Sequence, residues 1–318
     1  MADNTSYIGE PLNRVDGPLK VTGRATYAYE HQVPGAAFGV LVVSSIAKGR
    51  VVSIDTSKAS KQPGVLLVMT HENAPRIAKE EKKDDAPPGP GSAWQALQDD
   101  RIYYGGQPVA VVVAQTSTQA RAAAKMVGVR YATEQPENDL DSRIAEAYSP
   151  KKAGGGGEPA ASDRGNFDAA QQSAGHKLNE VYRTPFQFHN PMEPHATLAH
   201  WTGPDSLTVY DATQGVFGDA EKLAKAFGLK PENVRVVSPY LGGGFGSKGP
   251  TWSHVILSAL AAKQAGRPVR LEVSRPQMFN MVGLRSETRQ QIAIGADKGG
   301  SIQALSNDCV SHTSSGSL

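Results

Sequence analysis

The sequence predicts an α+β fold in which helices pack on mixed sheets. Residues 101–131 alternate strand, helix and strand, and residues 234–264 run from a β-branched strand through a glycine-rich loop into a helical pattern. The composition agrees, because 33 glycines and 21 prolines among 318 residues indicate many turns and do not suit a helical bundle. A chain of this length is expected to form two domains.

Composition excludes several classes of protein. The net charge of +2 implies no general attraction to nucleic acid. Cys309 is the only cysteine, so this chain holds no internal disulfide, iron–sulfur cluster or thiolate zinc site of its own. No apolar run approaches the roughly 18 residues of a membrane span. The N-terminus lacks a signal-peptide pattern, which predicts a cytoplasmic location for this chain by itself.

Alternating apolar residues and turn residues predict the elements of the first half. Strands are expected at residues 24–29, 37–44, 50–55, 65–69, 101–104, 108–114 and 129–131, and helices at 56–61 and 116–127. Thr116 or Ser117 is a candidate cap of the second helix. The charge run 79–85 is typical of a solvated surface.

A glycine-rich stretch divides the chain. Residues 133–166 contain AGGGGEPAASDRGN, which cannot build a core and is typical of a flexible linker. We therefore place one domain at residues 1–132 and a second at 167–318. The second is expected to hold strands at 177–183, 206–211, 234–237, 269–273, 291–295 and 302–310, and helices at 216–228 and 252–264.

The segment FHNPMEPHATLAHW gathers polar side chains that invite a metal-site interpretation: His189, Glu193, His195 and His200. Their spacing does not match a helical zinc motif, and two prolines exclude a regular helix there. We interpret Glu193 and His195 as buried, hydrogen-bonded structural residues.

The loop in VRVVSPYLGGGFGSKG admits three interpretations: a tight turn, a nucleotide-binding loop, or a loop for a larger phosphate-bearing cofactor with Phe245 against it. The common nucleotide motifs do not fit. The order Gly246-Ser247-Lys248 differs from that of a phosphate loop, and Ser247 stands where the dinucleotide motif needs glycine.

GGGFGSK resembles the cofactor loop of the molybdopterin-binding subunit of the xanthine dehydrogenase and aldehyde oxidoreductase family. The segments KVTGRATYAYE, PGVLLVMTHENAP and DDRIYYGGQPVAVVVAQTSTQARAAAKMVGVRY are similar to its α/β hammerhead domain, and HNPMEPHATLA is similar to a segment near its active site. The resemblance implies a hammerhead domain followed by the first part of the molybdopterin-binding region.

The resemblance also implies site residues. The Thr-Gln pair before the loop carries the glutamine that hydrogen-bonds the apical oxo group on molybdenum, here Gln214. The implied cofactor-binding residues are Gln214, Gly243, Gly244, Phe245 and Gly246, with Gln214 and Phe245 near the metal but not ligating it. The family's glutamate base has no match in this chain, so no catalytic residue is assigned.

The implied reaction is hydroxylation of an aldehyde by water-derived oxygen. Gly249 stands where purine-oxidising members carry a glutamate, which favours an aldehyde. The implied cofactor is molybdenum-molybdopterin, in a dinucleotide form such as the cytosine dinucleotide. A single cysteine places the 2Fe-2S clusters, with FAD, on partner subunits.

Several alternatives stay open at this point. The missing domains belong either to a second polypeptide or to a longer form of the chain, and export to the periplasm with a partner subunit would override the location predicted above. The chain could also be an inactive fragment, a non-catalytic docking subunit, or part of a purine or N-heterocycle hydroxylase.

Overall fold

The computed structural model describes residues 8–78, 96–150 and 159–312. Its largest feature is a seven-stranded mixed sheet whose strands share the order β10-β9-β8-β11-β1-β5-β3. These strands are β10 (Val234–Val237), β9 (Ser206–Asp211), β8 (Ala196–Gly203), β11 (Val269–Glu272), β1 (Ala37–Val43), β5 (Pro108–Ala114) and β3 (Val65–Thr70). Two neighbouring pairs, β1 with β11 and β10 with β9, are parallel, and the other pairs are antiparallel.

Helices cover both faces of this sheet, which confirms the α+β prediction. Successive side chains of a strand point to opposite faces, and β5 shows the consequence. Val111 and Val113 join the core cluster that contains α7 (Ser253–Ala265), while Val112 packs in a separate cluster with Ala59 and Ala123. The latter two residues lie on α2 (Ser57–Ser60) and α3 (Ser117–Ala124). Because both faces are covered, every residue of β5 is buried.

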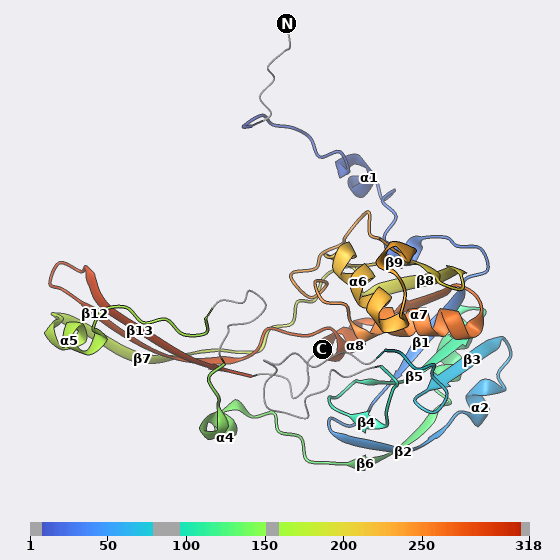
Figure 1. Cartoon of the computed structure of the whole chain (residues 1–318), viewed down its shortest axis with the longest axis horizontal. Helices are drawn as coiled ribbons and strands as arrows, with labels where there is room; N and C mark the ends of the chain where they lie inside the picture. Colours follow the sequence, from blue (N-terminus) through green and yellow to red (C-terminus); the bar gives the residue numbers. More distant parts are fainter. Residues whose placement is uncertain (1–7, 79–95, 151–158, 313–318) are drawn as a thin grey trace, which may run out of the picture.

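Two three-stranded sheets complete the part of the chain that the structure describes. One consists of β4 (Arg101–Ile102), β2 (Gly49–Asp55) and β6 (Gly128–Thr133); the other consists of β13 (Ile302–Ser311), β12 (Thr288–Ala296) and β7 (His176–Thr184). The second of these extends away from the main body as an arm, with α5 (Phe167–Ser173) near its end (Figure 1).

The remaining helices are short, apart from α6 (Val216–Phe227). They are α1 (Gly17–Val21), α4 (Leu140–Arg143), α8 (Arg275–Met281), and the 3₁₀ turns η1 (Ala28–Glu30), η2 (Ile144–Glu146) and η3 (Pro231–Asn233). As the sequence predicts, Thr116 caps α3 by accepting a hydrogen bond from the Gln119 backbone. Gly228 ends α6 in a left-handed conformation with φ 65°. No helix within the described ranges has the length and apolar character needed to cross a bilayer.

The predicted strand at residues 24–29 is wrong. The chain there is irregular and then forms η1, in which the Tyr27 backbone N–H donates to the Glu30 side chain over 2.8 Å. The alternation that suggested a strand instead buries Ala25 and Ala28, and η1 packs on β8 and β9. The sequence interpretation also missed β8, which follows directly after the prolines of HNPMEPH. The charge run 79–85 lies outside the described residues.

Strands from both sides of the predicted linker meet in the seven-stranded sheet. β1 lies in the predicted first domain and β11 in the second, and they pair in parallel with Ala37 opposite Val269. The core cluster on the α7 face likewise draws on both halves of the chain. The division at residues 133–166 remains a prediction about sequence organisation, and the main sheet extends across it.

Candidate functional site

The glycine loop and the turn that carries Gln214 lie at the same edge of the main sheet. β9 and β10 are parallel neighbours, with Tyr210 opposite Val237. Parallel strands end at the same edge, so the segments that follow β9 and β10 are brought together there. Residues 212–215 lead into α6, and residues 238–252 lead into α7. This pairing explains how Gln214 meets a loop some thirty residues further along the chain.

Gln214 is held against the loop by two hydrogen bonds. Its backbone N–H donates to the Lys248 carbonyl oxygen over 2.7 Å, and its side-chain Oε1 accepts from the Gly246 N–H over 3.1 Å. Because Oε1 must face that donor, the Nε2 amide group points away from the loop. Gln214 is exposed, and within the described residues no hydrogen bond engages Nε2. Two N–H donors are therefore available at this surface.

The loop glycines allow this close contact. A Cβ atom at Gly244 would lie 2.4 Å from Gln214 Oε1, so only glycine leaves the amide in place. Gly243 and Gly246 have φ angles of 94° and 98°, which favour glycine. The main chain of the loop therefore comes close to the surface, where a ligand can approach it.

Phe245, at the outer turn of the loop, combines two unusual features. Its φ is 55°, a left-handed conformation that costs a bulky residue free energy, and its side chain is 61% exposed. Its carbonyl oxygen accepts a hydrogen bond from Arg285 Nη2 over 3.1 Å. A strained, exposed aromatic residue next to two free amide donors indicates a surface that a ligand covers.

The lower side of the loop is closed by an ion pair. Lys248 Nζ lies 2.8 Å from Glu193 Oε2, and the same carboxylate oxygen accepts from the Gly242 N–H over 2.7 Å. The Lys248 side chain is fully buried and that of Glu193 is 12% exposed. Burial lowers the pKa of Lys248, and Glu193 opposes that shift. This lysine points into the protein, unlike the lysine of a phosphate loop, so the nucleotide interpretation is not supported.

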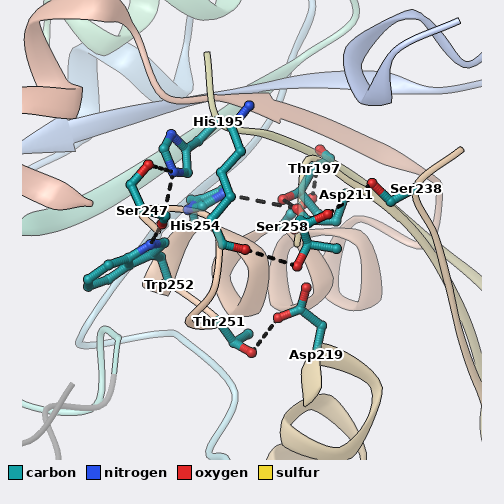
Figure 2. Close-up of polar contacts among 12 residues, drawn as sticks. His195, Thr197, Asp211, Asp219, Ser238, Ser247, Thr251, Trp252, His254 and Ser258 are labelled. Atoms are coloured by element: carbon teal, nitrogen blue, oxygen red, sulfur yellow. Dashed lines mark hydrogen bonds and ion pairs between the residues drawn. The ribbon is translucent and has the colours of Figure 1, made fainter. Parts of the chain in front are cut away.

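His195, two residues after Glu193, contacts the loop from below. Its Nε2 lies 3.3 Å from the Ser247 carbonyl oxygen, which also accepts from the Trp252 indole N–H. Figure 2 shows the rings of His195 and Trp252 directed toward Ser247. Burial lowers the pKa of His195 to about 4, so the ring is neutral near pH 7. These contacts confirm that Glu193 and His195 are hydrogen-bonded within the fold.

A second buried group of polar residues, which the sequence interpretation missed, lies at the ends of β9 and α6 (Figure 2). Thr197 donates to Asp211, and Thr251 donates to Asp219. Burial raises the pKa of both carboxyl groups, that of Asp211 well above its usual range. His254 Nε2 lies 4.0 Å from Asp211 Oδ1, and burial lowers the pKa of His254 far below its usual value. In sequence, these residues stand alone at strand and helix ends and give no recognisable motif.

The described residues contain no group of three or more histidine, cysteine, aspartate or glutamate side chains arranged to hold a metal ion. The four polar residues of FHNPMEPHATLAHW have separate surroundings. Glu193 pairs with Lys248, His195 lies under Ser247, His189 lines a small pocket with Met278 and Phe279, and His200 lies on β8. A group bound at the outer side of the loop would meet backbone amides, Gln214 and Phe245, with Arg285 beside Phe245.

Comparison with protein families gives two matches that together span most of the chain. Residues 154–316 match the molybdopterin cofactor-binding domain, and residues 22–135 match the aldehyde oxidase and xanthine dehydrogenase a/b hammerhead domain. The chain belongs to the xanthine dehydrogenase and aldehyde oxidoreductase family. The cofactor loop and all but the first two residues of the hammerhead segments predicted from the sequence lie within these matches, which confirms the resemblance.

Curated relatives agree with this assignment. The aldehyde oxidoreductase molybdenum-binding subunit PaoC of Escherichia coli O157:H7 is 40% identical over 309 residues, which cover 96% of this chain and 40% of that protein. The putative xanthine dehydrogenase molybdenum-binding subunit XdhA of Escherichia coli K12 is 30% identical, with coverage of 94% and 40%. The chain thus spans about 40% of the length of these relatives.

Solved structures share the fold. The aldehyde oxidoreductase of Desulfovibrio gigas superposes with a TM-score of 0.77 at 24% identity, covering 94% of this chain and 34% of that one. Quinoline 2-oxidoreductase of Pseudomonas putida 86 gives a TM-score of 0.79 at 22% identity, with coverage of 94% and 38%. This chain therefore shares its fold with the corresponding part of these two solved structures.

Proposed function

We propose that this chain forms the first part of a molybdopterin-binding subunit in an enzyme that oxidises an aldehyde to a carboxylic acid. One observation carries the proposal. Gln214, Gly244 and Gly246, predicted as cofactor contacts, lie in mutual contact at one exposed surface with Phe245 beside them. Family membership supports the cofactor, and the relative named as an aldehyde oxidoreductase subunit supports the substrate class.

The residues at this surface fit a large cofactor with many hydrogen-bond acceptors. Gly244 permits close approach of the main chain, the Gln214 amide offers two donors outward, and Phe245 offers an exposed ring. The molybdenum would be held by the sulfur atoms of the pterin, so the protein needs no metal ligands at the loop. When bound, the cofactor would supply the two-electron redox chemistry.

The residues of this chain would position the cofactor and stabilise charge that develops on it. Gln214 Nε2 would donate to an oxygen at the metal, and a preorganised donor of this kind stabilises negative charge without reorganising during the reaction. Its orientation is set before binding, because Oε1 is already engaged by Gly246. Phe245, which follows Gly243 and Gly244 and precedes Gly246, would cover one face of the cofactor and keep water from it.

Other groups must come from outside the described residues. The glutamate base of the family has no counterpart in this sequence, and Cys309 cannot ligate an iron–sulfur cluster alone. We therefore assign the base to the part of the relatives that this chain does not span, and the 2Fe-2S clusters and FAD to partner subunits. Gly249, where a purine-oxidising member carries glutamate, favours an aldehyde substrate. The same proposal includes a dinucleotide form of the pterin, such as the cytosine dinucleotide. It places the chain in the cytoplasm unless a partner subunit carries it to the periplasm.

Metal and pterin analysis tests the proposal. The chain is purified alone and together with the products of its neighbouring genes, and molybdenum and released pterin are quantified in each. Molybdopterin in the complex, with turnover of an aromatic or aliphatic aldehyde and little turnover of xanthine, is the expected result. Absence of molybdenum from both preparations would leave a non-catalytic docking subunit or an inactive fragment as the better explanation.

A further inference from the structure

Glu193 contacts both ends of the glycine loop. Its backbone N–H donates to the Gly242 carbonyl oxygen over 3.0 Å, and its carboxylate accepts from the Gly242 N–H over 2.7 Å. At the other end, Lys248 Nζ donates to the Glu193 carboxylate over 2.8 Å and to the Glu193 carbonyl oxygen over 3.0 Å. One residue thus fixes the separation of positions 242 and 248, between which Phe245 and Gly246 are exposed.

Lys248 extends this connection to Gln214. Its carbonyl oxygen accepts from the Gln214 N–H over 2.7 Å and from Thr213 Oγ1 over 3.3 Å. The Lys248 side chain and main chain therefore link Glu193 on one side to Gln214 on the other. A shift of Lys248 would move the backbone of Gln214 and, through it, the amide that meets Gly246.

Neither charged group of this pair reaches the exposed surface. The Lys248 side chain is 0% exposed and that of Glu193 is 12% exposed, whereas Phe245 on the outer side of the loop is 61% exposed. A Cβ atom at Gly242 would lie 2.5 Å from Glu193 Cβ, so the loop start packs tightly on this residue. The pair is buried beneath the loop, and its members can influence a ligand only through the backbone they hold.

We propose that Glu193 and Lys248 are positioning residues that hold the glycine loop and Gln214 in the cofactor-binding arrangement before the cofactor arrives, without touching it. The inference rests on the proposed function for the identity of the ligand. A buried charge that loses its partner destabilises a protein strongly, whereas removal of both charges together is often tolerated. The two charges must therefore be removed together to separate loop positioning from folding.

The test compares the double variant Glu193→Gln/Lys248→Met with the parent in the full 318-residue chain. Its matched control is Glu221→Gln/Lys225→Met, which removes an exposed ion pair of 2.6 Å on α6. Hydrogen exchange of the amides of residues 242–248 is measured without cofactor, next to the thermal midpoint. Molybdopterin content is measured after co-purification with the partner subunits.

In the double variant, we expect the loop amides to exchange on the order of ten-fold faster while amides of β5 and α7 keep their protection. Cofactor retention should fall roughly ten- to hundred-fold, the scale for groups that orient a ligand's contacts. The control should match the parent in both measurements. Unchanged loop exchange in a folded double variant would overturn the proposal, and so would lost cofactor with unchanged exchange, because that result would mean direct contact. A parent without molybdopterin but with the exchange difference would refute the proposed function and leave the loop assignment standing.

Discussion

Gln214 has a geometry that gives its side chain one orientation. The amide oxygen is engaged by the Gly246 N–H, and the amide nitrogen faces outward. A side chain held this way pays little further entropy when a ligand binds, because its rotamer is already fixed. The function of this residue therefore depends on the loop glycines as much as on the glutamine itself.

Replacement Gln214→Ala should leave the fold intact and lower turnover roughly ten- to thousand-fold, the scale of losing one preorganised donor. The physical reason is that the outward amide is lost while the Lys248 carbonyl still accepts the backbone N–H of residue 214. The rate constant kcat is measured in the assembled enzyme and normalised to molybdenum content. Turnover equal to that of the parent would mean that this side chain has no part in the reaction.

Replacement Gly244→Ala should act through the same contact. The new Cβ would lie 2.4 Å from Gln214 Oε1 and displace a flexible side chain, so we expect stability to change by less than about 1 kcal/mol while turnover falls as in Gln214→Ala. The double variant should be no worse than either single variant, because both remove one interaction. In the matched control, Gly218→Ala on α6, the new methyl group meets nothing within 4 Å apart from its chain neighbours and the backbone of its own helix. It should raise the free energy of unfolding by about 0.5–1 kcal/mol. Additive losses in turnover would contradict the shared contact.

The ends of β9, α6 and α7 are joined beneath the site by buried polar groups. Asp211 ends β9, Asp219 lies in the first turn of α6, and Thr251 precedes α7. His195 and His254 pack edge to face with ring centroids 5.7 Å apart. Such a group of titratable residues makes the junction of these elements sensitive to pH, and histidines and aspartates contribute with opposite signs.

For His195, the folded-state pKa of about 4 lies below the ordinary value of 6.5. The unfolded chain therefore binds more protons between these values, and stability falls as pH drops from 6.5 toward 4 by about 1.4 kcal/mol per unit. The variant His195→Gln lacks this titration. The free energy of unfolding of the parent should therefore fall relative to that of His195→Gln by about 1.4 kcal/mol per pH unit between pH 6.5 and 4.5. Urea unfolding at several pH values measures it.

Asp211→Asn provides the opposite slope. The folded-state pKa of Asp211 is raised, so the parent loses stability as pH rises above the ordinary carboxyl range, and the variant does not. The free energy of unfolding of Asp211→Asn should therefore rise relative to that of the parent as the pH increases from 4 to 7. Parallel pH profiles for all three proteins would show that neither side chain titrates abnormally in the fold.

The arm formed by β7, β12 and β13 presents an apolar row to solvent. Leu178, Ile294 and Leu305 lie opposite one another in the register of the three strands. The other face of the arm is covered near α5. There Gln171, in this helix, and Ala174, just after it, lie against Gly295. Leu178 is 38% exposed and Leu305 62% exposed. Exposed apolar rows of this kind favour association.

The isolated chain should therefore self-associate through the arm at high concentration. Leu305→Lys places a charge at the β13 end of this row and should shift the protein toward monomer in light scattering or sedimentation. The control Val52→Lys changes an exposed valine, 57% exposed on β2, in a different sheet. Equal association of the parent and both variants would show that the arm is not the contact.

Local pattern was sufficient for much of this protein. The runs at 108–114, 206–211 and 234–237 became strands at those positions, because their β-branched and apolar residues suit a buried sheet whatever their neighbours. The sequence also indicated the cofactor loop, because four glycines around one phenylalanine are more than a simple turn requires. The strand prediction for residues 24–29 was wrong because these alternating residues pack on the main sheet without pairing with a neighbouring strand.

Tertiary structure alone decided which of these pieces meet. The local spacing of apolar residues does not show that β1 pairs with β11, more than two hundred residues away. It also does not show that the Lys248 side chain points inward to Glu193. Those outcomes depend on long-range strand order and on the cost of burying a charge without a partner, which are properties of the whole fold. The sequence by itself therefore determined the family, the loop and most elements, and only the folded chain determined that Gln214, Gly246 and the Glu193–Lys248 pair form one connected site.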